Sequence, residues 1–390
     1  MFRRRDGGFR QKLVHVTLRG ALYGSWVLGL FPFTYDSWTR KLHRSKWLIG
    51  YGIVLNVGIV ALILANDTES ETPVRMEVFQ RNPLAERINS IHDYHSLVMV
   101  ALMLLRCYWK SGDIANILNE LMDLQWRHFR HYPLEDCCSF DDFVLHRGLS
   151  MVLELFSMLV MELGMSPNYS PQLFLGTTGL CIMILVVLLG ASHFHLAVVY
   201  IYRCVWIVNR ELLRFANQLA EGETVESCKV DRLLSLYSRL LELNHRLAGN
   251  YDYQMVMVMV SFLAANVLGI YYYIIFSISL HKEMNAILLF IVPQAMIINM
   301  YDFWLAIAVC DLAERTGRKT STILKLFNDI ENLDISLERS ISDFALFCSH
   351  QRFRFRHCGL FYVNYEMGFR MAITSLLYLL FLIQFDFSNL

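Results

Sequence analysis

Long apolar runs separated by short polar stretches dominate the pattern of this 390-residue chain. A membrane-spanning helix needs about 20 mostly apolar residues, because about 30 Å of hydrocarbon is crossed at about 1.5 Å per residue. Seven runs meet this requirement: residues 46–65, 88–108, 143–164, 173–202, 254–280, 286–310 and 361–385. The pattern therefore predicts an all-α, seven-transmembrane helical bundle.

Basic residues indicate the orientation of this bundle. Lys and Arg crowd the N-terminal arm and the loops after the second, fourth and sixth spans, whereas the alternate loops are nearly free of them. Because basic loops stay in the cytosol, this asymmetry predicts a cytosolic N-terminus and an extracellular C-terminus. Two N-glycosylation sequons, at Asn66 and Asn168, fall in the predicted outer loops. A G-protein-coupled receptor has the reverse orientation, so that class is disfavoured.

Composition agrees with a membrane protein, with 55% hydrophobic residues and a mean hydropathy of +0.37. Zero net charge provides no basic field that would attract nucleic acid. A shorter apolar run, residues 21–33, follows Arg19 and ends near Pro32. At about 13 residues it is too short to span a bilayer, so we interpret it as an interfacial or re-entrant segment.

Two cytosolic loops contain leucine-type residues at spacings of three and four, which place them on one helix face. The first set is Leu233, Leu236, Leu240, Leu243 and Leu247. The second set is Ile323, Leu326, Ile330, Leu333 and Leu337. Both loops are therefore predicted to form helices that extend the bundle into the cytosol. Each run covers barely two heptads, so packing within one subunit and packing between subunits both remain open.

Catalytic and metal-binding motifs are absent: there is no G-x-S-x-G, no P-loop and no H-E-x-x-H. His193 and His195 could bind a metal, but two residues apart on a helix they point in different directions, so they are interpreted as structural. We expect no enzyme activity, no cofactor and no metal.

Ionisable residues inside a bilayer are costly, which makes Glu154, Glu162 and Asp302 functional candidates. For Asp302, a ligand or water cavity and a structural hydrogen-bond network are both possible. Glu366 and Arg370 lie four residues apart on the last span, where they are predicted to form a structural ion pair.

A small-molecule pocket needs aromatic walls with a few polar groups, and the outer halves of spans two to six supply both. The interfacial aromatic belt of membrane proteins explains the tyrosines equally well. The candidate pocket residues are His92, Tyr94, His95, Met161, Glu162, Thr177, Tyr271, Tyr272, Gln294 and Asp302.

The last span places Leu377, Phe381 and Gln384 on one narrow helix face. If several copies of this helix surround an axis, apolar side chains could gate by dewetting, and a ring of amides could meet permeating ions. The alternative is one interhelical hydrogen bond from Gln384.

The end of the chain resembles the insect gustatory receptor family, whose signature is Thr-Tyr, five hydrophobic residues and Gln-Phe. This sequence matches at Tyr378, Gln384 and Phe385 and departs at Leu377, where the family has Thr. Residues 358–364 resemble the family's lead-in to that helix, and residues 20–33 resemble a fruit-fly clade associated with bitter taste.

This resemblance implies a ligand-gated, non-selective cation channel that detects small tastants, assembled as a homo- or heterotetramer in the plasma membrane of gustatory neurons. An accessory subunit that forms no pore, and a metabotropic receptor, are the alternatives. The implied domains are a cytosolic arm (1–45), spans one to six with cytosolic loops 109–142 and 203–253 (46–310), a cytosolic anchor (311–360), and the pore helix with its outer tail (361–390). The implied pore residues are Leu377, Tyr378, Phe381, Gln384 and Phe385. The implied assembly residues are Leu233, Leu236, Leu240, Leu326, Ile330 and Leu333.

Overall fold

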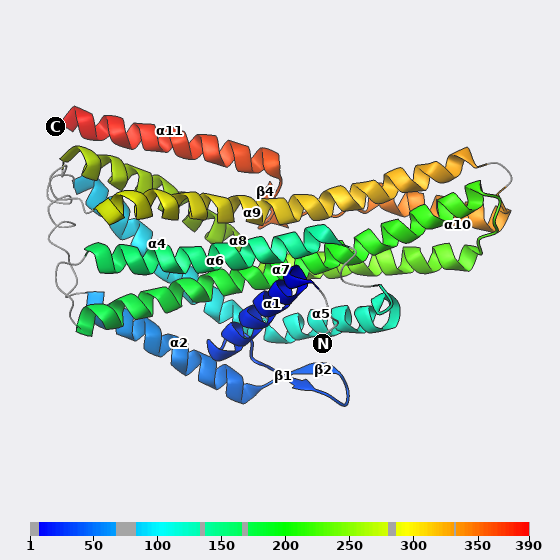
Figure 1. Ribbon diagram of the computed structural model, residues 1–390, viewed down its shortest axis with the longest axis horizontal. Coiled ribbons are helices and arrows are strands. Elements are labelled where there is room, and N and C mark those ends of the chain that lie inside the picture. The colour runs from blue at the N-terminus through cyan, green and yellow to red at the C-terminus, as the bar shows by residue number, and fades with distance from the viewer. Residues whose placement is uncertain are drawn as a thin grey trace.

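The computed structural model describes residues 8–67, 83–132, 137–165, 171–279, 286–330 and 333–389. Within these ranges, seven helices are long and apolar enough to cross a membrane, and they run along one common direction (Figure 1). They are α2 (Lys46–Asp67), α4 (Pro83–Trp109), α6 (Cys138–Met165), α7 (Pro171–Ala220), α8 (Ser227–Ser279), α9 (Ala286–Lys325) and α11 (Tyr365–Asn389). The predicted all-α, seven-span bundle is confirmed.

Shorter elements connect these spans. The helical ones are α1 (Phe9–Val27), α5 (Ser111–Leu124), the π-helical turn η1 (Gln125–Phe129), the 3-10 turn η3 (Leu326–Asp329) and α10 (Ile335–His350). Two antiparallel hairpins complete the described chain: β1 (Phe33–Asp36) with β2 (Lys41–Arg44), and β3 (Arg356–His357) with β4 (Phe361–Tyr362). Their registers pair Phe33 with Arg44 and Arg356 with Tyr362.

Three of the spans are much longer than a membrane requires. Helices α7, α8 and α9 contain 50, 53 and 40 residues. At about 1.5 Å per residue, α7 is ~75 Å long, more than twice the ~30 Å hydrocarbon core. Their far ends run together beyond α11, where α10 packs against α8 and α9 (Figure 1). The expected helical extensions of the bundle are therefore present.

The first leucine stripe is buried inside this extension. Leu233, Leu236 and Leu240 are 9%, 8% and 0% exposed, and they share one core cluster with Phe344 of α10. Helix α8 packs there against α10, which also contacts α9. Packing within the subunit, one of the two alternatives, therefore accounts for these three residues.

The second stripe does not lie on one helix. Helix α9 ends at Lys325, Leu326 begins the 3-10 turn, and Ile330 has an extended backbone with φ −96° and ψ 119°. The expectation of one helical face from 323 to 337 is wrong. Asn328 and Asp329 lie at the break, and short polar side chains favour turns over helix interiors.

Only the first part of the predicted interfacial run, residues 21–27, belongs to a helix, and that helix is longer than the run. Helix α1 begins at Phe9, lies across α6 and α7, and ends at Val27, after which the chain turns at Gly29 with φ +70° (Figure 1). A Cβ on Gly29 would lie 2.3 Å from the Cα of Gly52 in α2, so the turn and the first span touch only because both residues are glycine. Val16 and Tyr23 are exposed on α1, which suits a helix lying at a membrane surface.

Candidate functional site

Helix α11 has a defined beginning. Asn364 precedes it, and its side-chain oxygen accepts a hydrogen bond from the backbone N–H of Met367 at 2.9 Å. This is the N-cap arrangement that satisfies a free N–H of the first turn. Glu366, in that turn, pairs with Arg370 at 2.6 Å, as the sequence predicted. Its carboxylate also lies at the positive end of the helix dipole.

The hairpin that leads into α11 is held by a buried polar contact. The Asp252 carboxylate of α8 accepts a hydrogen bond from the Cys358 backbone N–H at 2.5 Å and lies 3.1 Å from Nδ1 of His357. Burial lowers the pKa of His357, although Asp252 opposes this effect. His357 also packs edge-on against Phe194 of α7, with ring centroids 5.8 Å apart. The base of α11 is therefore fixed to both α7 and α8.

Most of the candidate pore residues point away from the rest of the subunit. Leu377 and Phe381 are each 61% exposed, and Gln384 and Phe385 are exposed as well. Tyr378, 64% exposed, lies at the edge of this face and also lines a cavity. The opposite side of α11 packs against α8 and α9 (Figure 1). An exposed apolar face of this size on a membrane helix suits contact with lipid or with another subunit.

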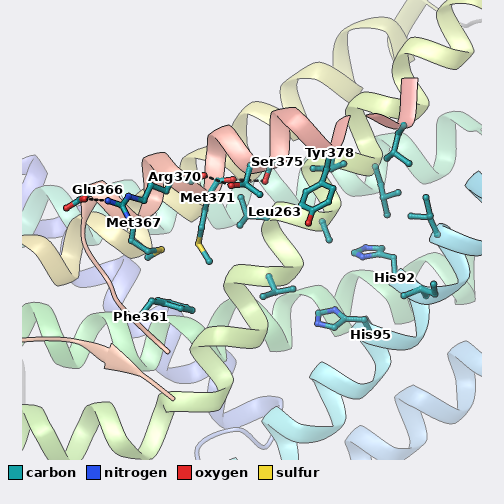
Figure 2. Close-up of a pocket in the computed structure, with 18 of the residues that line it drawn as sticks. His92, His95, Leu263, Phe361, Glu366, Met367, Arg370, Met371, Ser375 and Tyr378 are labelled. Carbon is teal, nitrogen blue, oxygen red and sulfur yellow. Dashed lines mark hydrogen bonds and ion pairs between the residues drawn. The ribbon is translucent and has the colours of Figure 1, made fainter. Parts of the chain in front are cut away.

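A cavity of about 830 Å³ lies behind α11, between α4, α8 and α11 (Figure 2). Its walls are mainly apolar, and His92 and His95 of α4 face Met371 and Tyr378 of α11 across it (Figure 2). Nδ1 of His95 lies 3.3 Å from the Ser261 hydroxyl of α8. Pockets for small organic ligands have this size and this mixture of apolar walls with few polar groups.

Three candidate site residues, His92, His95 and Tyr378, meet in this cavity. Tyr271 is buried beside its outer end, in a cluster with Leu379 and Leu382, and Tyr272 packs against that cluster. Leu382 lines the cavity, so this cluster lies behind one end of it, the roof of the cavity.

The other pocket candidates lie elsewhere. Tyr94 is 71% exposed, Thr177 is buried on α7, and Gln294 is half-buried on α9. The side chains of Met161, Glu162 and Asn66, and the whole of Asn168, fall outside the described part of the chain.

Asp302 is part of an ion pair inside the bundle. Its carboxylate lies 2.9 Å from Nη1 of Arg147 on α6, and the two side chains are 0% and 3% exposed. The same guanidinium donates to the Ser192 hydroxyl at 2.9 Å and to the Leu188 carbonyl of α7 at 3.1 Å. Glu154, on α6, also interacts with Asp302. Arg147 therefore joins α6, α7 and α9.

Sequence reasoning missed Arg147 as the partner of Asp302. A signal was present, because a basic residue inside an apolar span needs a counter-charge. The sequence does not show which acidic residue of the six other spans is the partner of Arg147. That depends on the packing of α6 against α9, which makes these two helices close neighbours.

Metal binding finds no support in the described residues, where no group of three or more His, Cys, Asp or Glu could hold an ion. The two histidines of α7 have separate surroundings. Nε2 of His193 lies 2.7 Å from the Ser25 hydroxyl of α1, whereas His195 packs edge-on against Phe143 of α6. Both side chains therefore help to pack α7 against its neighbours.

The fold and the site define a multi-pass membrane protein with a mainly apolar cavity of small-molecule size. The chain belongs to the 7tm chemosensory receptor family, whose model matches residues 18–389. Members of this family are chemoreceptors and not enzymes.

Named relatives narrow this class. The chain is 70% identical over its full length to the gustatory receptor for bitter taste 22e of Drosophila melanogaster, all of which is covered. It is 46% identical to putative gustatory receptor 22a of the same species, with 97% of this chain and 95% of the relative aligned. The resemblance inferred from the last helix and the N-terminal run is confirmed.

Solved structures support the fold. The insect olfactory receptor OR5 from Machilis hrabei matches with a TM-score of 0.67, over 96% of this chain and 99% of that one. Its complex with eugenol matches with a TM-score of 0.65, over 97% and 100%. Both are 12% identical to this chain, so the likeness concerns the fold alone.

Proposed function

We propose that this chain is a subunit of a tetrameric, non-selective cation channel that opens when a small bitter or aversive tastant binds. The observation that carries the proposal is the position of α11, the last span. Its family-motif residues Tyr378, Gln384 and Phe385 lie on the exposed surface of the subunit. Four copies arranged around an axis would cover this apolar face and line a central pore with it.

The cavity provides a route from ligand binding to the pore. Tyr378 belongs both to the cavity wall and to the motif of α11. A tastant in the cavity therefore touches the pore helix directly. If the cavity changes shape when the pore opens, a tastant that fits the open shape better shifts the equilibrium toward opening.

The pore assignment is tested with Gln384→Ala, recorded as single channels in excised patches without nucleotides. We expect a changed conductance or open time, because the amide is removed from the pore wall. Gln351→Ala is the matched control, since Gln351 is exposed and lies before α11. Single-channel records of Gln384→Ala identical to those of the wild type would contradict the pore assignment. A current that requires G protein would favour a metabotropic receptor.

The tastant site is tested with His92→Ala. Loss of one hydrogen bond of about 1.4 kcal/mol should raise the half-activating concentration about tenfold. Tyr94→Ala on the same helix is the control, because Tyr94 is 71% exposed and does not line the cavity. An equal effect of both substitutions would contradict binding in the cavity. Current that appears only with co-expressed relatives, and that Gln384→Ala leaves unchanged, would identify an accessory subunit.

A further inference from the structure

The cavity behind α11 is open at the side of the subunit. Ile91 of α4 lines it, although this residue is 68% exposed. Ile91 lies in a membrane span other than α11, so the opening beside α4 faces the bilayer interior. Lipid acyl chains, and not water, are the molecules available at that depth.

The two ends of the cavity differ in polarity. At the roof, Leu382 packs with Leu379 and Tyr271 in an apolar cluster. At the end where α11 begins, the wall contains Glu366 and Arg370, which are 70% and 77% exposed and 2.6 Å apart. The space is therefore amphipathic along its length, with one carboxylate and one guanidinium at the end where α11 begins.

The length of the cavity matches one leaflet. Arg370 and Leu382 are both wall residues. Twelve helical steps separate them, or ~18 Å at about 1.5 Å per residue. Half of the hydrocarbon core is ~15 Å. A lipid whose headgroup lies at Arg370 can therefore extend one acyl chain to the apolar roof.

We propose that this cavity is a binding site for a zwitterionic phospholipid from the leaflet in which α11 begins. The phosphate binds the Arg370 guanidinium, the ammonium of the headgroup faces the Glu366 carboxylate, and one acyl chain fills the space between α4, α8 and α11. Guanidinium groups bind phosphate through paired N–H donors, and a carboxylate attracts an ammonium.

Selectivity for this lipid comes from the charged end. An acyl chain gains no hydrophobic free energy when it moves from the bilayer into the cavity, because lipid tails are as apolar as the side chains there. The Glu366–Arg370 pair, being exposed, is weak and can separate to bind a headgroup of matching charges. A lipid with only negative charge would pair with the Arg370 guanidinium. It would have no ammonium to pair with the Glu366 carboxylate, which would repel it.

One consequence rests on the proposed function. If the tastant binds beside His92 and His95, it displaces the acyl chain from the wall of the pore helix. The lipid then holds the resting shape of the cavity, and the tastant competes with it.

The site is tested with the full chain in nanodiscs that contain phosphatidylcholine with a photoreactive group at the end of one acyl chain. After illumination, label is expected in peptides that contain Ile88 of α4, Leu268 of α8 or Leu382 of α11. Ala264→Trp fills the cavity from α8 and should abolish this label. Ala101→Trp, an exposed position of α4 outside the cavity, should retain it.

The headgroup contact has its own pair of variants. Arg370→Glu should abolish cavity labelling, whereas the exchange of both charges, Glu366→Arg with Arg370→Glu, should restore it. Melting curves and gel filtration confirm that each variant is folded. Full labelling of Ala264→Trp, or even labelling of all lipid-facing helices, would overturn the site. Full labelling of Arg370→Glu would overturn the headgroup contact.

The photolabelling experiment does not depend on channel current. A silent channel that is labelled as described would support the lipid site and count against channel function. An active channel without cavity label would support the channel and refute the lipid site. Unlabelled tastant should reduce the label at Leu268 if the two ligands compete, and unchanged label would refute the competition.

Discussion

Removing Arg147 is expected to destabilise the bundle more than any substitution at an exposed ion pair. Its guanidinium is 3% exposed and contacts Asp302 at 2.9 Å, Ser192 at 2.9 Å and the Leu188 carbonyl at 3.1 Å. Arg147→Met therefore breaks the links to α7 and α9 together, and it leaves the fully buried Asp302 carboxylate without its counter-charge.

The expected loss is about 3–5 kcal/mol in the free energy of unfolding, the usual cost of removing one member of a buried pair. Most of that cost comes from the charge left behind. Arg147→Met combined with Asp302→Leu should therefore recover to within about 1 kcal/mol of the wild type, since an apolar replacement of the whole pair is often neutral.

Denaturant titration in detergent micelles measures all members of this double-mutant cycle. Arg10→Met is the control, because Arg10 and Asp142 form an exposed pair at 2.5 Å, with side chains 46% and 54% exposed. This control should lose less than about 1 kcal/mol. The reasoning is refuted if Arg147→Met is no worse than Arg10→Met, or if the double variant is less stable than Arg147→Met alone.

Two further predictions concern the base of α11 and the turn after α1. Burial keeps His357 neutral in the folded chain and lowers its pKa below the ordinary 6.5, so stability should be full above pH 6.5 and should fall as the pH drops below it. His357→Gln should flatten this pH dependence of the melting temperature, whereas the exposed His350→Gln should not. Gly29→Ala should cost at least about 1–2 kcal/mol, because its φ is +70° and the new Cβ would meet Gly52. Gly58→Ala, with nothing within 4 Å, should cost far less, and equal melting temperatures would contradict the close packing at this turn.

The apolar pattern predicted the spans well because each span must satisfy its own backbone hydrogen bonds in lipid. The first predicted run, 46–65, coincides with the observed candidate span Lys46–Ala65. Prediction failed where helices leave the membrane. Spacing alone could not distinguish α8, which continues through Leu240, from α9, which ends at Lys325. In water, a turn at Asn328 costs little, and tertiary packing decides where the helix stops.

The candidate site was predicted only in part. Local spacing was enough for the Glu366–Arg370 pair, because both residues lie on one helix. It was not enough for the cavity, since His92 and Tyr378 are far apart in the chain and meet only through the packing of α4, α8 and α11. Aromatic residues of the spans look alike in sequence, whether they line the cavity, as Tyr378 does, or lie outside it, as Tyr94 does.

The sequence by itself determined that this chain is a seven-span helical membrane protein, because hydrocarbon thickness and backbone hydrogen bonding act on each segment separately. The motif of its last helix, by resemblance, also indicated the chemoreceptor family. Tertiary structure alone decided which buried charges are paired, which leucines are internal, and where an open space remains beside α11. Those features depend on contacts between helices such as α6 and α9, which bring Arg147 to Asp302. Such contacts follow from the shapes of whole helix surfaces, and no single segment of the chain contains that information.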